Sequence, residues 1–460
     1  MNQNNISAAE LFQRVRELLM LPELEPQTRN KMMHDTLILC CHEGVKDTKQ
    51  AFGNLFSQVD YLCKARGIKV ADKIAIQTMR RHSNSQEPLS GEDLKYDARA
   101  LALFISAVFG VDVPHELNVL IPHTPRPYQK GLEINNRRIR CIVKNWDGDF
   151  IRVDIDQDAD EEEYLVQLKD EENHIDHTYL WDILKEGMQL NLLDCQVKQP
   201  IITPRLIVVE PDYLVDISSI ATCFTAFGHH PLLYLLNLMK PRANTQATLL
   251  GNFAGAALDD IINSHGKYQM NETVKTNFRE KALEFCTCPW FDPKKFYTDA
   301  SLQAFNLQQV VDILFPRTAS QAQMTAFRGE SLYDRKKAIL EPSFVCEALG
   351  IQGRVDLMTT DCKLLVEQKS GRNMNIETHQ VDPGYHSYQL EPHYVQLLLY
   401  YGVLQHNFKL SNDRVNIRLL YSKYRPQDGL MVVAYYQKLF KEAIQYRNQL
   451  VAASFEIAKE

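Results

Sequence analysis

The spacing of apolar residues changes several times along the chain, and these changes constrain the fold more than any single motif. From about residue 6 to residue 109, apolar residues recur every three or four positions, which is the helical period. From residue 131, apolar and polar residues alternate, which is typical of strands. The helical period returns after residue 224, and strands return at residue 344. We therefore predict an α+β chain made of several modules.

The 460-residue length suits about three domains. We predict a helical N-terminal module at residues 1–120, a small β-barrel at residues 130–210 and a larger α/β domain at residues 211–460. Short strands separated by turn formers are typical of a barrel such as the oligonucleotide-binding (OB) fold. The second module carries basic and aromatic side chains, for which contact with single-stranded DNA and a purely packing role are equally open. They are Arg137, Arg138, Arg140, Lys144, Trp146 and Arg152.

The composition is that of a folded protein, with 45% hydrophobic and 24% charged residues. A net charge of −7 argues weakly against nucleic-acid binding, so local basic patches would have to supply it. A short basic cluster at Arg80, Arg81 and His82 fits a solvated helix end better than a phosphate contact. Neither a membrane helix nor a signal peptide is indicated. We therefore expect a cytoplasmic protein without membrane partners, whose scattered cysteines are reduced.

Two acidic residues and a lysine stand at the ends of neighbouring apolar runs in residues 353–371, which read GRVDLMTTDCKLLVEQKSG. Asp356 ends one run, and after a tight turn the run LLVE leads to Glu367, Gln368 and Lys369. The turn predicts an antiparallel strand pair, which would place Asp356 near Glu367. Glu367 and Lys369 are two residues apart and therefore point to the same face of a strand.

These residue types suit the metal-dependent cleavage of phosphodiesters. Mg²⁺ and Mn²⁺ prefer oxygen ligands, which Asp356, Glu367 and the backbone carbonyl of Gln368 can supply. A divalent ion can provide a hydroxide nucleophile and neutralise charge on the phosphoryl oxygens. The Lys369 ammonium can hold the attacking water or stabilise the developing anion. From these residues alone, a structural salt bridge between Glu367 and Lys369 explains the pattern as well as catalysis does.

The order G-x-x-D, then E-x-K, then a helix with Gln396 and Tyr400 four residues apart resembles the PD-(D/E)XK nuclease superfamily, in its RecB-like branch. The resemblance implies a restriction-endonuclease-like core in the third module, with Asp356, Glu367 and Lys369 as catalytic residues. It also implies that Gln396 and Tyr400 contact DNA and brace the site. The module order is similar to the nuclease part of helicase-nucleases that trim 5′ flaps in DNA replication and repair. DNA and a helicase, in cis or in trans, are the implied partners, and the uncapped helix at the chain end suits a module boundary.

Two features depart from that family's pattern. The family holds an iron–sulfur cluster with one cysteine before the first nuclease helix and three after the QxxxY helix. Cys223 matches the first position, but no cysteine follows Cys362, so we expect no cluster and a buried thiol at Cys223. The family's first metal ligand, a histidine, falls at Gly255 in LLGNFAG. We predict that Asp259, one helical turn later on the same face, replaces it as a metal ligand.

The sequence therefore favours a Mg²⁺- or Mn²⁺-dependent deoxyribonuclease that cuts single-stranded or flap DNA. A second hypothesis, supported by Gly255, is a catalytically degenerate nuclease fold that serves as a DNA-binding or scaffolding module of a helicase-nuclease machine. A recombination or CRISPR-adaptation exonuclease of the same branch would share the chemistry, and the predicted barrel argues against it. The position of the Asp259 carboxylate relative to Asp356 and Glu367 distinguishes the first two hypotheses.

Overall fold

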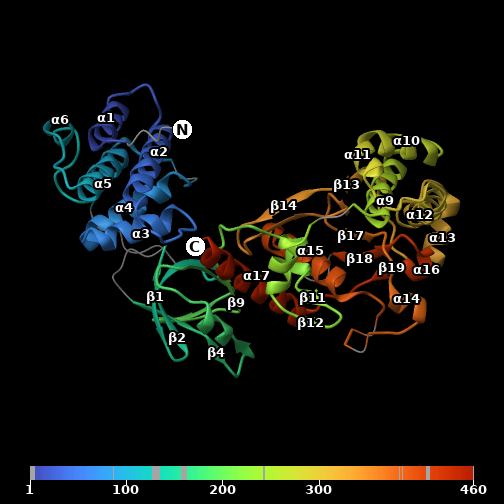
Figure 1. Ribbon diagram of the computed structural model, residues 1–460. Helices are drawn as coiled ribbons and strands as arrows, with labels where there is room; N and C mark the ends of the chain where they lie inside the picture. Colours follow the sequence, from blue (N-terminus) through green and yellow to red (C-terminus); the bar gives the residue numbers. More distant parts are fainter. Residues whose placement is uncertain are drawn as a thin grey trace. The chain divides into compact units, whose positions relative to one another are not determined.

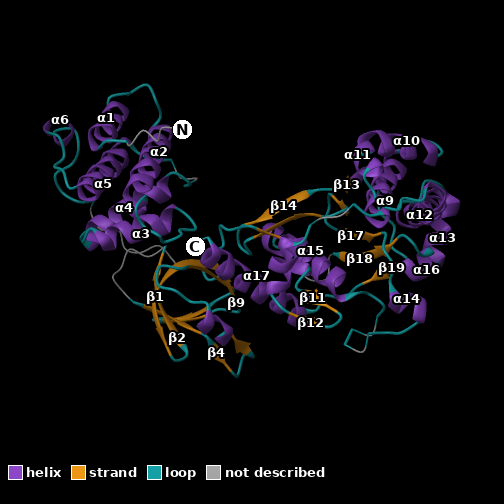
Figure 2. Cartoon of the chain, in the orientation of Figure 1, coloured by secondary structure: helices purple, strands orange, loops and turns teal. Residues whose placement is uncertain are grey.

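The computed structural model describes residues 6–85, 88–126, 135–156, 163–241, 244–382, 384–385, 387–410 and 415–458. Helices and small sheets both occur along these residues, which confirms the predicted α+β class (Figure 1, Figure 2). The chain divides into two compact units, Met1–Tyr213 with Val451–Glu460, and Leu214–Leu450. None of the helices in these ranges combines the length and the apolar character that a membrane span needs.

The first unit begins with helices, as the apolar period predicts. They are α1 (Ala8–Leu19), α2 (Pro26–Val45), α3 (Leu55–Ala65), α4 (Val70–His82), α5 (Gly91–Phe109) and the short α6 (His115–Asn118). Ser7 caps α1 and Ser90 caps α5, each by accepting a hydrogen bond from a backbone amide of the first turn. The apolar faces of these helices share one core, which includes Leu11, Leu37 and Leu101.

A seven-stranded sheet completes the first unit, in the order β7-β8-β3-β2-β1-β6-β9. Its strands are β1 (Arg138–Asp147), β2 (Phe150–Ile155), β3 (Tyr164–Gln167), β6 (Gln189–Leu193), β7 (Gln196–Lys198), β8 (Ile201–Thr203) and β9 (Leu206–Val209). A small hairpin pairs β4 (Lys169–Asp170) with β5 (Ile175–Asp176), and a 3₁₀ turn, η1, spans Thr178–Asp182. The predicted closed barrel is not formed, because the outer strands β7 and β9 do not pair within the described residues.

The break between β6 and β7 explains part of this difference. The alternation over residues 188–197 predicts one strand, but Asp194 has a φ of 50°, in the left-handed region that interrupts a strand. The chain turns there, so that β7 pairs with β8 at one edge of the sheet while β6 pairs with β1 and β9. A single residue thus divides a predicted strand between distant parts of the sheet.

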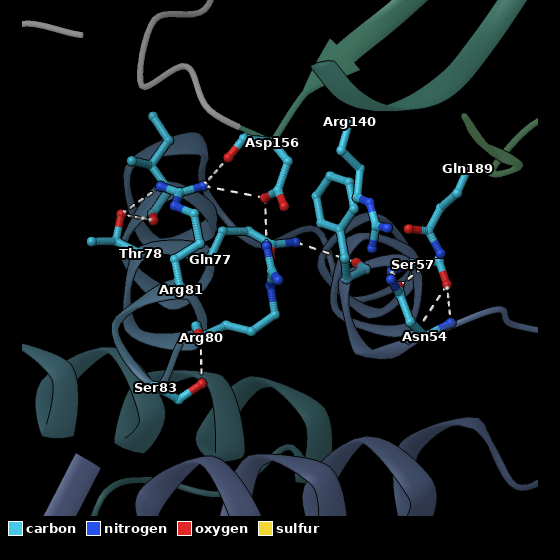
Figure 3. A network of polar contacts seen from close by, with 12 residues as sticks. Asn54, Ser57, Gln77, Thr78, Arg80, Arg81, Ser83, Arg140, Asp156 and Gln189 are labelled. Carbon is cyan, nitrogen blue, oxygen red and sulfur yellow. Dashed lines mark hydrogen bonds and ion pairs between the residues drawn. The ribbon is translucent and has the colours of Figure 1, made fainter. Parts of the chain in front are cut away.

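Ion pairs connect the helices to the sheet within the first unit (Figure 3). Arg81 donates from Nη1 to the backbone carbonyl of Asp156 at 2.5 Å, and Arg80 pairs with the carboxylate of Asp156. Lys73 of α4 lies 3.0 Å from the carboxylate of Asp154 on β2. The prediction that the basic cluster is solvated is therefore wrong for Arg80 and Arg81, which are ion-paired and mostly buried.

The second unit is built on a five-stranded sheet in the order β13-β16-β17-β18-β19. These strands are β13 (Ala338–Leu340), β16 (Leu357–Thr359), β17 (Leu364–Lys369), β18 (Asn416–Tyr421) and β19 (Leu430–Val432). β16 and β17 are antiparallel, as predicted, and Cys362 adopts a φ of 54° in the turn between them. β18 runs parallel to β17. A second sheet joins β10 (Val215–Asp216), β15 (Ile351–Arg354) and β14 (Ser343–Cys346), and β11 (Phe224–Thr225) pairs with β12 (Gly228–His229).

Helices precede, separate and follow these strands along the chain, and the last of them runs on into residues that belong to the first unit. They are α7 (Ile217–Ala221), α8 (Leu232–Met239), α9 (Gln246–Asn263), α10 (Met270–Glu280), α11 (Ala282–Cys286), α12 (Pro293–Leu314), α13 (Ala319–Phe327), η2 (Arg335–Lys337), α14 (Met374–Thr378), α15 (Glu391–Phe408), α16 (Pro426–Gly429) and α17 (Gln437–Ile457). α9 and α12 share an apolar core with Leu364 and Val366 of β17 (Figure 1). Leu365, between these two, points to the opposite face, where α15 packs. α17 begins at Gln437, after β19 at Leu430–Val432.

Candidate active site

Asp356 and Glu367 lie opposite each other at the ends of β16 and β17. Leu357 pairs with Val366, and this antiparallel register extends by one residue to place Asp356 beside Glu367. The backbone amide of Gln368 donates to Oδ2 of Asp356 at 2.6 Å, which fixes that carboxylate against the strand end. The structure therefore brings the two acids together, as antiparallel pairing predicts.

The backbone carbonyl of Gln368 points toward the same side as its amide, because both polar groups of a strand residue face one neighbouring strand. On the other side, the carbonyl of Lys369 accepts a hydrogen bond at 2.9 Å from the amide of Ser422, after β18. The Gln368 carbonyl is thus directed toward the β16 side, where Asp356 lies. Carboxylates of Asp356 and Glu367 interact at this strand end, and the Gln368 carbonyl is directed to the same side; oxygens of these kinds are the donors that hard divalent cations prefer.

Lys369 is fixed by two hydrogen bonds on the face that carries Glu367. Its Nζ lies 2.7 Å from Oε1 of Glu367 and 2.8 Å from Oε1 of Gln396 on α15. One turn along α15, the hydroxyl of Tyr400 donates to the backbone carbonyl of Arg354 at 2.6 Å. α15 therefore holds both the lysine and the chain that leads into Asp356.

Burial dominates the electrostatics of the two acids. Burial, and after it the charge of Asp356, raises the pKa of Glu367 to about 8, although Lys369 opposes the rise. Burial also raises the pKa of Asp356, against the amide of Gln368 and the charge of Lys369. Oε2 of Glu367 is buried and has no hydrogen-bond partner among the described residues. A buried oxygen without a donor, next to a second carboxylate, is a position that a cation would stabilise.

This donor set fits a magnesium-type ion, which is commonly held by one or two carboxylates and completed by water and substrate phosphates. The unpartnered oxygen of Glu367 supports the same conclusion. Across the described ranges, no three His, Cys, Asp or Glu side chains are grouped so that they could hold a metal ion. The protein itself would thus supply two carboxylates and the carbonyl of Gln368.

Asp259 lies close enough to Asp356 for the charge of that carboxylate to act on it, although no metal-holding group of three such side chains forms in the described ranges. It is half-buried on α9, where burial, followed by the charges of Glu341 and Asp356, raises its pKa to about 7. The space beside Gly255 is open. A Cβ added to this residue would have no atom within 4 Å apart from its chain neighbours and the backbone of its own helix. The role of Asp259 as a metal ligand stays a prediction.

Two residues at this site, Glu341 and His393, have no place in the sequence prediction. Glu341 has a φ of 49°, its amide donates to the carbonyl of Asp356 at 3.0 Å, and its carboxylate lies 3.2 Å from Arg354. In the sequence, only the Glu341-Pro342 pair before β14 could have indicated an unusual backbone position at Glu341. His393 lies one turn before Gln396 on α15, where burial, and then the charge of Lys369, lowers its pKa to about 4. Its spacing of three from Gln396 could have indicated a position near the site.

Some of the basic side chains of the sheet, for which DNA contact was one of the two predicted roles, form ion pairs within the first unit. Arg140 lies 2.9 Å from the carboxylate of Asp212, and Lys144 lies 2.7 Å from that of Asp154. Trp146 is partly exposed near the β1–β2 turn. These contacts favour the packing role for Arg140 and Lys144, while Trp146 keeps a surface that a base could stack on.

Cys223 is a buried thiol, as expected, and burial raises its pKa to about 12. His229, on the neighbouring strand β12, bridges two carboxylates: Nδ1 lies 2.7 Å from Glu442 of α17, and Nε2 lies 2.6 Å from Glu391 of α15. The hairpin of β11 and β12 is thereby tied to both helices. One of them, α15, carries Gln396.

Comparisons of the chain with protein-family models and with curated proteins find no match. The resemblance to PD-(D/E)XK nucleases therefore depends on the motif residues and on the geometry that surrounds them.

Proposed function

We propose that the chain is a divalent-metal-dependent deoxyribonuclease that cleaves phosphodiesters in single-stranded or flap DNA. One observation carries the proposal: Asp356 and Glu367 meet at one strand end, while Lys369 is held beside them by Glu367 and Gln396. A salt bridge that served stability alone would have no need of a second buried carboxylate. Here burial, and after it the charge of the second carboxylate, raises the pKa of Glu367, which weakens the pair with Lys369 rather than strengthening it.

The residues have distinct roles in this proposal. Asp356, Glu367 and the carbonyl of Gln368 would hold Mg²⁺ or Mn²⁺, which supplies a hydroxide nucleophile and neutralises phosphoryl charge when bound. Lys369 orients the attacking water and stabilises charge that develops on the phosphate. Gln396 keeps the ammonium of Lys369 in place, and Tyr400, on the same face of α15, braces the strand before Asp356.

A second function is favoured by the open space at Gly255. With no side chain at that position, the fold could serve as a DNA-binding or scaffolding module without catalysis. Two carboxylates remain sufficient for a magnesium-type ion, and the buried repulsion between them is costly for a fold that only binds. We therefore place activity first.

The biological setting is part of the same proposal. We assign the activity to DNA replication, recombination or repair in the cytoplasm, with a helicase that acts in cis or in trans. The support is the motif resemblance and the order of modules. The open sheet in place of the predicted barrel leaves the DNA-contacting role of the first unit to be tested separately.

The direct test is cleavage of end-labelled single-stranded and 5′-flap DNA by the full chain in Mn²⁺ or Mg²⁺. Lys369→Ala should lower the rate by about 10²–10³-fold, the usual cost of one stabilising donor in a site of this kind. Lys363→Ala is the matched control, because Lys363 is exposed in the turn before β17. Equal background from wild type and Lys369→Ala would overturn the proposal, and DNA binding without cleavage by the wild type would establish the scaffold alternative.

A further inference from the structure

We infer that Gln303 and Ser422 are positioning residues for the candidate active site, because a buried hydrogen-bond network through them fixes the strand end at Gln368, Lys369 and Ser370. This inference is built on the proposed function of that site and extends it to residues outside the nuclease motifs. Gln303 lies on α12 and Ser422 follows β18, so both are remote in sequence from the residues that they hold.

Ser422 makes three of the contacts. Its amide donates to the carbonyl of Lys369 at 2.9 Å, and its Oγ accepts a hydrogen bond from Nε2 of Gln368 at 3.2 Å. The same Oγ donates to Oε1 of Gln303 at 2.6 Å. Ser422 is fully buried, so these bonds do not compete with water.

Gln303 connects the network to the residue after β17. While its Oε1 accepts from Ser422, its Nε2 donates to the carbonyl of Ser370 at 3.0 Å. Three residues along the same face of α12, Asn306 donates from Nδ2 to the carbonyl of Ser422 at 3.0 Å. Gln303 and Asn306 are both about 1% exposed. α12 thus fixes the ends of both β17 and β18.

Two buried amides on one helix are costly unless each is hydrogen-bonded. α12 already has apolar residues, among them Leu307 and Val311, that pack against the sheet with α9. Packing alone would therefore be served by further apolar side chains. The amides of Gln303 and Asn306 instead form hydrogen bonds with the backbone carbonyls of Ser370 and Ser422, and Gln303 also bonds to the Ser422 hydroxyl. These contacts indicate that the amides control the geometry of the strand ends.

The network determines the direction of two groups of the site, the backbone carbonyl of Gln368 and the side chain of Lys369. Gln368 is held by its side chain to Ser422 and by its amide to Asp356, so its carbonyl cannot rotate away from the β16 side. The carbonyl of Lys369 is fixed on the β18 side, which sets the start of the lysine side chain. A misplacement of about 1 Å at such groups can cost about 100-fold in rate.

The test uses Gln303→Leu, Gln303→Glu and Ser422→Ala in the full chain, with Gln309→Leu as a matched control on the exposed face of α12. Gln303→Leu should lower kcat for DNA cleavage by about 10–100-fold and leave KM unchanged, since the network positions groups rather than binds DNA. Gln303→Glu keeps the acceptor for Ser422 and should retain an intermediate kcat. Gln303→Leu and Ser422→Ala combined should cost less than the product of their separate effects.

Backbone hydrogen exchange of the metal-free chain gives a readout that does not depend on activity. Gln303→Leu should accelerate exchange in residues 368–371 and leave residues 364–366 of β17 unchanged. If the wild type cuts no DNA, the proposed function fails, while localised acceleration of exchange still supports the network. Unchanged exchange in Gln303→Leu, an equal loss of kcat in Gln309→Leu, or accelerated exchange spread evenly over the second unit would each overturn the inference.

Discussion

Lys369 donates from Nζ to Oε1 of Gln396 at 2.8 Å, although 27 residues separate the two along the chain. The same nitrogen lies 2.7 Å from Oε1 of Glu367. Holding a long lysine side chain at two points costs conformational entropy. That cost is understandable if the ammonium must act at one position, which is what the nuclease proposal requires.

Replacement of Gln396 tests this relationship. Gln396→Leu should lower the rate of DNA cleavage by about 10–100-fold, because the ammonium of Lys369 loses one of its two fixed partners. Gln396→Glu keeps an acceptor oxygen and should retain most of the rate. Single-turnover rates at saturating DNA measure both variants, and equal rates for Gln396→Leu and wild type would exclude a positioning role for this residue.

Divalent cations should stabilise the chain through Glu367. At a concentration about 100 times the dissociation constant, Mn²⁺ should add about 2.7 kcal/mol to the free energy of unfolding. In a unit of this size that corresponds to an increase in Tm of about 5–10 °C. Glu367→Gln should abolish the increase, because it removes one of the two charged ligands. Differential scanning calorimetry with and without Mn²⁺ measures this effect, and an equal shift in both proteins would place cation binding elsewhere.

Gly255 offers a gain-of-function test. No restricting atom lies within 4 Å of a Cβ there, so Gly255→His should fold, and Gly255→Ala should add about 0.5–1 kcal/mol because it removes a helical glycine. If the open space faces the cation site, the imidazole should lower the Mn²⁺ concentration needed for half-maximal activity. Gly255→Ala controls for the helix effect. Identical Mn²⁺ dependence of the histidine and alanine variants would show that this helix face does not reach the cation.

His229 should make the stability of the second unit depend on pH. Burial lowers the pKa of His229, but hydrogen bonds and charges from Glu442 and Glu391 outweigh it, so the net pKa is raised. Tyr385 also bonds to Glu391, and the ring of Tyr446 lies beside the imidazole.

A raised pKa in the folded state means that the stabilisation is complete below the ordinary histidine pKa and is lost as pH rises through the folded value. Relative to His229→Gln, the wild type should therefore be more stable by about 1–3 kcal/mol at low pH, and the difference should shrink at alkaline pH. Urea unfolding across this range measures the effect. A difference that stays constant with pH would indicate that the imidazole is not charged in the fold.

Local patterns predicted the parts of the site that depend on neighbouring residues. The turn after Thr359 fixed the antiparallel partner of β17, and the helical period placed Gln396 and Tyr400 on one face of α15. The parallel pairing of β17 with β18 and the contacts of Gln303 depend on tertiary packing, which no local period encodes.

The errors have a similar origin. Asp194 in the left-handed region divides a strand that alternation alone makes continuous, and the outer strands β7 and β9 do not pair within the described residues. Arg80 and Arg81 bind Asp156, which is more than 70 residues away and therefore invisible to an inspection of charge clusters. Glu341 takes its place beside Asp356 through a backbone hydrogen bond between two strand ends.

The most direct test of the nuclease proposal is the rate of single-stranded DNA cleavage in Mn²⁺ by wild type and Glu367→Gln, compared at equal DNA occupancy. The account predicts cleavage by the wild type and a loss of about 10²–10⁴-fold in the variant, with DNA affinity retained, because the carboxylate serves the chemistry rather than DNA binding. Wild-type protein that binds DNA and cleaves no faster than Glu367→Gln would contradict it.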